Sequence, residues 1–131
     1  DWRILNALGV ALDQSGRHDR ARSRFEQALL ASGGEPAVLN NLALSAMLGG
    51  DPERAESLLR RAADDDAAGP EIRQNLALAL ALQGRFNEAE EIALVDSTPE
   101  MAEQNLDYVR ALMSSGRSYD RLREAELRGM R

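Results

Sequence analysis

Few residues of this 131-residue chain could catalyse a reaction or hold a metal ion. It has one histidine, His18, and no cysteine, so the usual zinc ligand sets cannot be assembled. Asp64, Asp65 and Asp66 are consecutive; carboxylates placed so at a helix end point in different directions, and no calcium-loop pattern follows. The serines lie in no nucleophile-elbow pattern. The sequence therefore predicts no enzyme, no metal and no cofactor, with His18 and the three aspartates solvated in turns.

Asparagine is the residue type whose recurrence points to recognition instead. Asn6, the pair Asn40 and Asn41, and then Asn75 follow one another along the chain. An amide group both donates and accepts hydrogen bonds, so a row of amides could bind the backbone of a partner segment with little regard to its sequence. The alternative is that these amides bond to neighbouring helices or to water.

The asparagines belong to a repeat of 34 residues whose copies begin at Trp2, Pro36 and Pro70. In each copy, apolar residues recur at helical spacing, break at a glycine and then resume, which predicts a helix, a tight turn and a second helix. The columns that align are Leu8, Leu42 and Leu76; Gly9, Ala43 and Ala77; Leu12, Ala46 and Leu80; Gly16, Gly50 and Gly84; and Ala21, Ala55 and Ala89.

A helix–turn–helix unit of this length resembles the tetratricopeptide repeat. The first copy is similar to the family's signature at Leu5, Leu8, Gly9, Leu12, Ala21, Phe25 and Ala28. Later copies depart from it, with Ala43 and Ala77 in place of the glycine, and Leu59 and Ala93 in place of the phenylalanine. The resemblance implies an all-α, right-handed TPR solenoid. We expect a single domain over 1–131, with repeats at about 2–35, 36–69 and 70–98 and a capping helix pair at about 99–131.

Glycines and prolines predict where the helices begin and end. The expected helices span about 2–14, 20–32, 36–48, 52–63, 70–83, 87–94, 99–115 and 119–131, with Asp19, Asp51 and Thr98 as N-terminal caps. Gly9 is the one glycine inside the first seven predicted helices, and its column should mark a close approach of the two helices of a repeat. Changing Ala77 to Leu should therefore overpack the contact between these two helices and lower the free energy of unfolding by about 1–3 kcal/mol.

Composition excludes several classes of function. The net charge of −6, with acidic and basic residues interspersed, argues against nucleic-acid binding, which draws on a basic face. No apolar run is long enough for a transmembrane segment. With 44% hydrophobic but only 4% aromatic residues, the core must consist mostly of Leu and Ala, which suits closely spaced helices.

A second face of each first helix remains once the signature residues have taken the core positions. The resemblance makes this face the concave groove that binds a partner. Leu44, Met47 and Leu78 on it are more apolar than solvent requires and are the expected anchors, unless they pack under the next repeat. The predicted groove residues are Arg3, Asn6, Val10, Asn40, Asn41, Leu44, Met47, Asn75, Leu78 and Arg110.

One kind of ligand can be set aside. Chaperone-binding members of the family hold a peptide carboxylate with a clamp of Lys, Asn and Arg residues. Of the matching positions here only Asn41 agrees, and Glu71 would repel a carboxylate.

A narrower resemblance covers residues 70–115. The run RQNLALALALQGRFNEAEEIA, followed by D-x-x-P-E-x-A-x-x-N-x-x-Y-x-R from Asp96 to Arg110, is similar to the TadD family of tetratricopeptide lipoproteins in tight-adherence (Tad/Flp) pilus assembly. This implies a scaffold at the bacterial periplasm and outer membrane whose protein partner is a pilus component such as the secretin. The lipid anchor would need a cysteine ahead of Asp1, and the start at Asp1 leads us to expect a mature or truncated fragment.

Two alternatives stay open at this level. The chain could be the binding module of a larger cytoplasmic regulator or transferase, or a self-associating adaptor that forms a weak homo-oligomer. The sequence upstream of Asp1 would separate the first alternative from the pilus interpretation. Sedimentation at several concentrations would separate the second.

Overall fold

The computed structural model describes residues 1–114. Within that range the chain forms seven α-helices and no strand: α1 (Trp2–Gln14), α2 (His18–Ser32), α3 (Pro36–Leu48), α4 (Pro52–Ala63), α5 (Pro70–Leu82), α6 (Phe86–Ala93) and α7 (Pro99–Ser114). These bounds agree with the expected ones to within one residue at nearly every end. The helix predicted for residues 119–131 lies outside the described residues.

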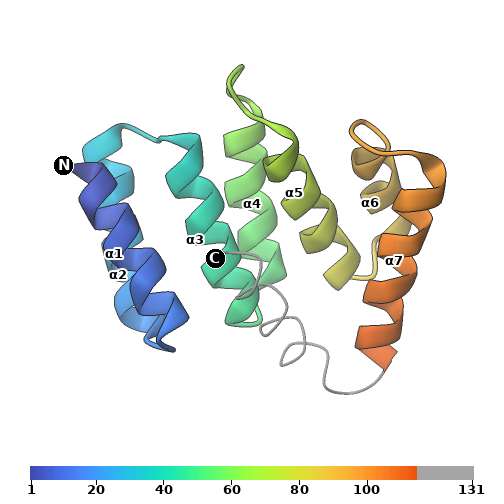
Figure 1. Ribbon diagram of the computed structural model, residues 1–131, viewed down its shortest axis with the longest axis horizontal. Coiled ribbons are helices and arrows are strands. Elements are labelled where there is room, and N and C mark those ends of the chain that lie inside the picture. The colour runs from blue at the N-terminus through green and yellow to red at the C-terminus, as the bar shows by residue number, and fades with distance from the viewer. Residues whose placement is uncertain (115–131) are drawn as a thin grey trace.

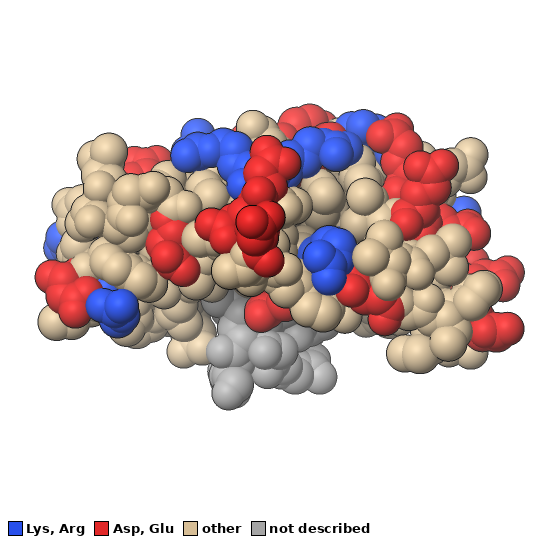
Figure 2. Space-filling view, turned by 90° about the horizontal axis from the view of Figure 1, so that it is seen from above, with Lys and Arg blue, Asp and Glu red and all other residues tan. Residues whose placement is uncertain are grey.

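The helices pair in sequence order and the pairs stack side by side (Figure 1). α1 packs on α2, α3 on α4 and α5 on α6, while α2 also contacts α3 and α4 contacts α5. The first helices follow one another, because α1 contacts α3 and α3 contacts α5; α7 then packs on α5 and α6. The result is an all-α helical solenoid with α1 at one end and α7 at the other. Charged side chains of both signs are interspersed along it (Figure 2).

Local sequence explains why the helices begin and end where they do. Four of them begin with a proline, whose missing N–H costs nothing in the first turn. The Asp51 side chain accepts a hydrogen bond from the N–H of Arg54, and Thr98 accepts one from the N–H of Met101, as expected of caps. The turns within repeats use Gly16, Gly50 and Gly84, each at a φ near +80°.

The cap predicted at Asp19 is wrong. α2 begins one residue earlier, at His18, and no side chain caps it. Asp19 lies in the first turn of α2, where its carboxylate accepts a hydrogen bond from the side chain of Arg22. An acidic residue in the first turn still interacts favourably with the helix dipole, so the residue supports the helix start without capping it.

Gly9 confirms the close approach predicted for its column. A Cβ built on Gly9 would lie 2.5–2.9 Å from three ring atoms of Phe25, which is fully buried on α2. Real Cβ atoms do not approach carbon so closely, so the first repeat needs a residue without a side chain here. In the other repeats the column holds Ala43 and Ala77, opposite the smaller Leu59 and Ala93.

A buried carboxylate joins the first two repeats, which corrects the prediction that His18 is solvated. Asp13 is fully buried at the end of α1, and Nδ1 of His18 lies 2.9 Å from its Oδ1. Ser45 on α3 donates to the same oxygen at 3.1 Å. Oδ2 of Asp13 has no hydrogen-bonding partner among the described residues. Burial raises the pKa of Asp13 above its ordinary value, although the bonds from His18 and Ser45 act in the opposite direction.

Candidate functional site

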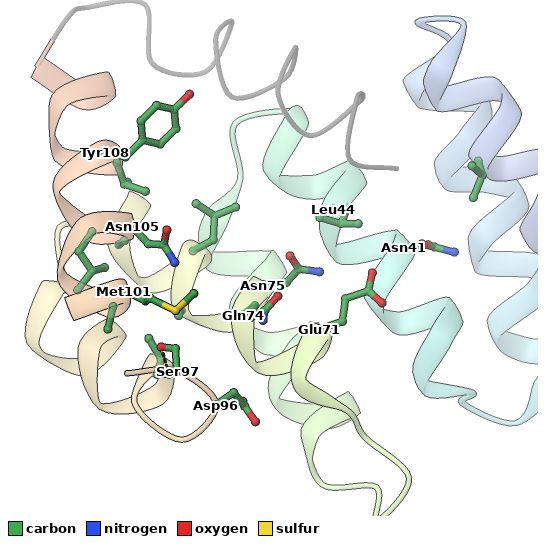
Figure 3. A pocket seen from close by; sticks show the side chains of 18 residues that line it. Asn41, Leu44, Glu71, Gln74, Asn75, Asp96, Ser97, Met101, Asn105 and Tyr108 are labelled. Atoms are coloured by element: carbon green, nitrogen blue, oxygen red, sulfur yellow. Dashed lines mark hydrogen bonds between the residues drawn. The ribbon is translucent and has the colours of Figure 1, made fainter. Parts of the chain in front are cut away.

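The array is hollowed between α5 and α7, on the side formed by the first helices of the repeats (Figure 3). The hollow has a volume of about 590 Å³, within the usual range for ligand sites. Its lining residues come from α1, α3, α5, α6, α7 and the loop before α7: Val10, Asn41, Leu44, Glu71, Gln74, Asn75, Ala77, Leu78, Ala81, Ala93, Asp96, Ser97, Met101, Ala102, Asn105, Leu106, Tyr108 and Val109. We call this set the groove.

Small side chains account for the position of the hollow. Ala77 and Ala81 on α5, Ala93 on α6 and Ala102 on α7 all line it. In the first repeat the place of Ala93 belongs to Phe25, whose ring fills the space between the helices. α7 packs on both α5 and α6, and the hollow lies between it and α5.

α7 forms the wall of the groove that carries the most exposed apolar surface. Met101, Asn105 and Tyr108 are spaced at i, i+4 and i+7, so they share one face of the helix. Met101 and Tyr108 are each 55% exposed, while Ala102 and Leu106 beside them are buried. A thioether and an aromatic ring on either side of an amide suit an apolar segment with a hydrogen-bonding backbone.

The opposite wall, on α5, is polar and acidic. Glu71, Gln74 and Asn75 project from it toward the hollow (Figure 3). Glu71 and Asp96 are the charged residues of the lining, which has no basic residue within the described range. The groove therefore favours a cationic group over an anionic one.

Asp96 is held by α5 and its charge is matched. Nε and Nη2 of Arg73 donate to the two carboxylate oxygens of Asp96 at 2.6 and 2.8 Å. These bonds lower the pKa of Asp96 below its ordinary value. The pair fixes the loop between α6 and α7 against α5 and so positions the start of α7 at the edge of the groove.

The asparagines follow the alternative stated above, in which their amides bond to neighbouring helices. Nδ2 of Asn41 donates to Oδ1 of Asn6 at 3.0 Å, and Nδ2 of Asn75 donates to Oδ1 of Asn40 at 2.8 Å. Each bond joins the first helices of successive repeats. Because each amide has further hydrogen-bonding capacity, Asn41 and Asn75 can still contact a segment in the groove, which both of them line.

The structure brings half of the predicted groove residues to the hollow: Val10, Asn41, Leu44, Asn75 and Leu78. Asn40 and Asn41 also line a smaller hollow of about 440 Å³ between the starts of α3 and α5. Asn40 itself is only 6% exposed, and its side chain accepts the bond from Asn75. Asn6 is half-buried and accepts the bond from Asn41.

Three predicted residues lie elsewhere. Met47 is 5% exposed and belongs to the core, so the expectation of an exposed anchor there is wrong; it is wrong for Leu44 too, which is 4% exposed and in the same core although it lines the groove. The guanidinium of Arg3 lies 4.8 Å from the Trp2 ring centroid, at the far end of the array. That of Arg110 lies 4.4 Å from the ring centroid of Phe86 and donates to Asp107. Neither arginine lines the groove.

Sequence reasoning named only Arg110 on α7 and left out the residues of this helix that line the groove, although a signal for them was present. Asp96, Asn105 and Tyr108 are fixed positions of the D-x-x-P-E-x-A-x-x-N-x-x-Y-x-R pattern, and all three line the groove. The pattern was interpreted as a capping helix, whose outer face need only tolerate water. Its i, i+4, i+7 spacing could have placed Met101, Asn105 and Tyr108 on one surface.

The described residues contain no cluster of three or more potential metal ligands. None of the seven helices is long and apolar enough to cross a membrane.

Comparison with family models decides the family. Two models, each described as Tetratricopeptide repeat, match residues 6–70 and residues 46–115. The chain belongs to the tetratricopeptide repeat family. Such repeats generally mediate protein–protein interactions and are typically scaffold modules without catalytic activity. No curated protein matches the sequence.

Proposed function

We propose that this tetratricopeptide array is a scaffold that holds a segment of a partner protein in the groove. The observation that carries the proposal is the pairing of two unlike walls across one hollow. Met101 and Tyr108 on α7 offer exposed apolar surface, and Glu71 on α5 offers a carboxylate. A segment that fits has an apolar side facing α7 and Leu78 and an Arg or Lys that reaches Glu71.

The narrower proposal is that the partner belongs to the tight-adherence pilus apparatus, with the secretin as the first candidate. Its support is the resemblance over residues 70–115, strengthened by the place of the motif residues. Asp96, Asn105 and Tyr108 come together around the hollow, as residues selected for binding would. In this proposal the protein works at the periplasmic side of the outer membrane, through a lipid anchor carried ahead of Asp1.

Affinity capture from the native cells tests both levels. The bait is the full-length protein in three forms: unchanged, with Tyr108→Glu, and with Ser23→Glu. Tyr108→Glu places a charge on the apolar wall. Ser23→Glu adds the same charge on the outer side of α2, where Ser23 is exposed and lies opposite the buried Ala21 and Phe25.

We expect pilus components to be captured by the unchanged protein and by Ser23→Glu, but not by Tyr108→Glu. Capture of other proteins with the same dependence on Tyr108 would refute the pilus assignment and leave the groove in place. Equal capture by all three forms would refute the groove itself.

A further inference from the structure

Hydrogen-bond acceptors from two neighbouring first helices meet in the groove. Glu71 and Asn75 are four residues apart on α5, so their side chains lie on one face of that helix. In Figure 3 the Glu71 carboxylate projects between the amide groups of Asn75 and of Asn41 on α3. Asn41 and Glu71 also line the smaller hollow between the starts of α3 and α5, so the three side chains lie where the two hollows adjoin.

The oxygens of these three side chains accept no hydrogen bond from any residue within 1–114. Asn41 and Asn75 each donate through the amide nitrogen to an asparagine of the preceding repeat, so their amide oxygens have no partner in that range. The Glu71 side chain is exposed and makes no hydrogen bond or ion pair there. Because each amide is held through its nitrogen, its oxygen is already positioned before a ligand binds.

Arg85 shows how this chain satisfies a similar set of acceptors elsewhere. Its Nη1 donates to Oε1 of Glu56 at 2.7 Å and to Oε1 of Gln83 at 3.2 Å. Its Nε and Nη2 donate to the two carboxylate oxygens of Glu88 at 2.9 and 2.7 Å. One guanidinium can bind carboxylates and an amide oxygen together because its N–H groups spread in a plane. The acceptors in the groove are of the same kinds, but neither hollow has a basic residue in its described lining.

Charge and the arrangement of donors together select arginine as the ligand of these acceptors. Glu71 and Asp96 are the charged residues of the described groove lining, and Asp96 already binds Arg73 with both oxygens. Glu71 is therefore the carboxylate of that lining whose charge is not matched. A lysine carries all its donors on one nitrogen, whereas a guanidinium carries them on three and can reach a carboxylate and separate amides at once.

We propose that Asn41, Glu71 and Asn75, which we call the arginine site, bind the guanidinium of an arginine in the partner segment. This inference rests on the proposed function, because it names the residue by which the polar wall of the groove recognises that segment. With an arginine held there, the apolar residues of the segment face Met101 and Tyr108 on α7. The arginine site thus fixes which side of the segment faces α5.

NMR titration of the full chain with Nα-acetyl-arginine methylamide tests the arginine site without the partner. The matched probe is Nα-acetyl-lysine methylamide, which carries the same charge on a different group. We expect the arginine probe to shift the side-chain amide signals of Asn41 and Asn75 and to reach saturation. The lysine probe should bind about threefold or more weakly, because it makes fewer hydrogen bonds to the same acceptors.

Two variants separate the site from a general effect of charge. Glu71→Gln should raise the dissociation constant of the arginine probe by about twofold to fivefold, as expected for an exposed ion pair. Glu53→Gln is the control, because Glu53 is also exposed and also follows the proline that begins its helix, but lies on α4. Shifts that do not saturate, equal binding of the two probes, or equal effects of the two variants would overturn the arginine site.

Affinity capture from the native cells with the same two variants distinguishes this inference from the proposed function. We expect Glu71→Gln, but not Glu53→Gln, to lower capture of a partner that also depends on Tyr108. Capture that depends on Tyr108 and is indifferent to Glu71→Gln would overturn the role of the arginine site and leave the groove intact. Capture that is indifferent to Tyr108→Glu as well would refute the proposed function, and the role of the arginine site with it.

Discussion

Phe25 in the first repeat and Ala93 in the third occupy equivalent places, each nine residues after its turn glycine. In the first repeat the Phe25 ring presses on Gly9 and fills the space between α1 and α2. In the third, the equivalent pair Ala77 and Ala93 is much smaller, and both residues line the groove. The same two positions thus form a packed contact in the first repeat and part of the groove lining in the third.

This difference relates the candidate site to the smaller side-chain volume at these positions in the third repeat. The helices and turns are common to both repeats, so the fold alone does not place the groove. The predictions below test that contrast, beginning with the largest expected change in the free energy of unfolding.

Phe25→Ala should lower the free energy of unfolding by about 3–5 kcal/mol, because a fully buried ring is removed and a cavity remains. Urea denaturation followed by circular dichroism measures the change. The matched variant is Ala93→Gly at the equivalent place, which should cost about 1 kcal/mol through helix propensity. Similar losses for the two variants would mean that the repeats are packed alike.

Gly9→Ala should cost about 1–3 kcal/mol by overpacking, since its Cβ would meet the buried Phe25 ring. The better helix propensity of alanine, about 1 kcal/mol, offsets only part of this. Ala77→Leu adds more atoms but borders the hollow, so its cost should be smaller, in contrast to the expectation from sequence alone. Denaturation midpoints for both variants check the order; a reversed order would contradict the packing described here.

His18→Ala should cost about 1–3 kcal/mol, because the buried carboxylate of Asp13 would lose a hydrogen-bonding partner. The third repeat offers no equivalent, since Ala81 stands where Asp13 does in the first. Arg17→Ala, next to His18 and exposed, is the control and should change little. Thermal unfolding of both variants at neutral pH is the measurement, and equal shifts would show that the contact with Asp13 contributes nothing.

Ala77→Gly combined with Ala93→Phe should give the third repeat the packing of the first. Loss of helix propensity at glycine costs about 1 kcal/mol, and burial of a phenylalanine contributes about 1.5–3 kcal/mol, so the net change in stability should be small. The groove should be partly filled, and capture of a partner should fall. A crystal structure of the double variant would show whether the ring enters the space between α5 and α6. If the ring occupies that space and capture is unimpaired, binding of the partner does not depend on the hollow.

Two carboxylates, one from each end of the array, should have pKa values shifted in opposite directions from the ordinary value of aspartate. The pKa of Asp13 is raised by burial, so its contribution to stability is present below the ordinary pKa of aspartate and is lost as the pH rises through the raised value. The pKa of Asp96 is lowered by the bonds from Arg73, so its contribution is present above the ordinary value and is lost as the pH falls through the lowered one. NMR titration of the side-chain carboxyl carbons measures both. Asp96 titrating above Asp13 would contradict the two environments.

Much of the fold could be predicted because its signals are local. Glycines that need a positive φ and prolines that begin helices act within a few residues, so they fixed most helix ends, and the repeat spacing then fixed the order of stacking. The failures concern contacts across helices. The 34-residue repeat puts Asn6 and Asn41, which are 35 residues apart, on neighbouring first helices, but whether their amides meet depends on the separation of α1 and α3.

The same reasoning explains the errors at His18 and on α7. Nothing local shows that Asp13 is buried, so a histidine in a turn was expected to be solvated. On α7, the prediction places Arg110 alone in the groove and assigns the rest of the helix to closing the array, although Tyr108 and Asn105 belong to the same motif.

The two asparagine bonds also limit how the molecule can bend. They lie on the inner side of the curve, where straightening the array would pull α1 from α3 and α3 from α5. At 3.0 and 2.8 Å, both bonds would lengthen and weaken if the first helices moved apart, so they oppose extension on this side of the array. Opening the array should therefore cost more free energy than closing it, by the net contribution of these two bonds, about 0.5–1.5 kcal/mol each.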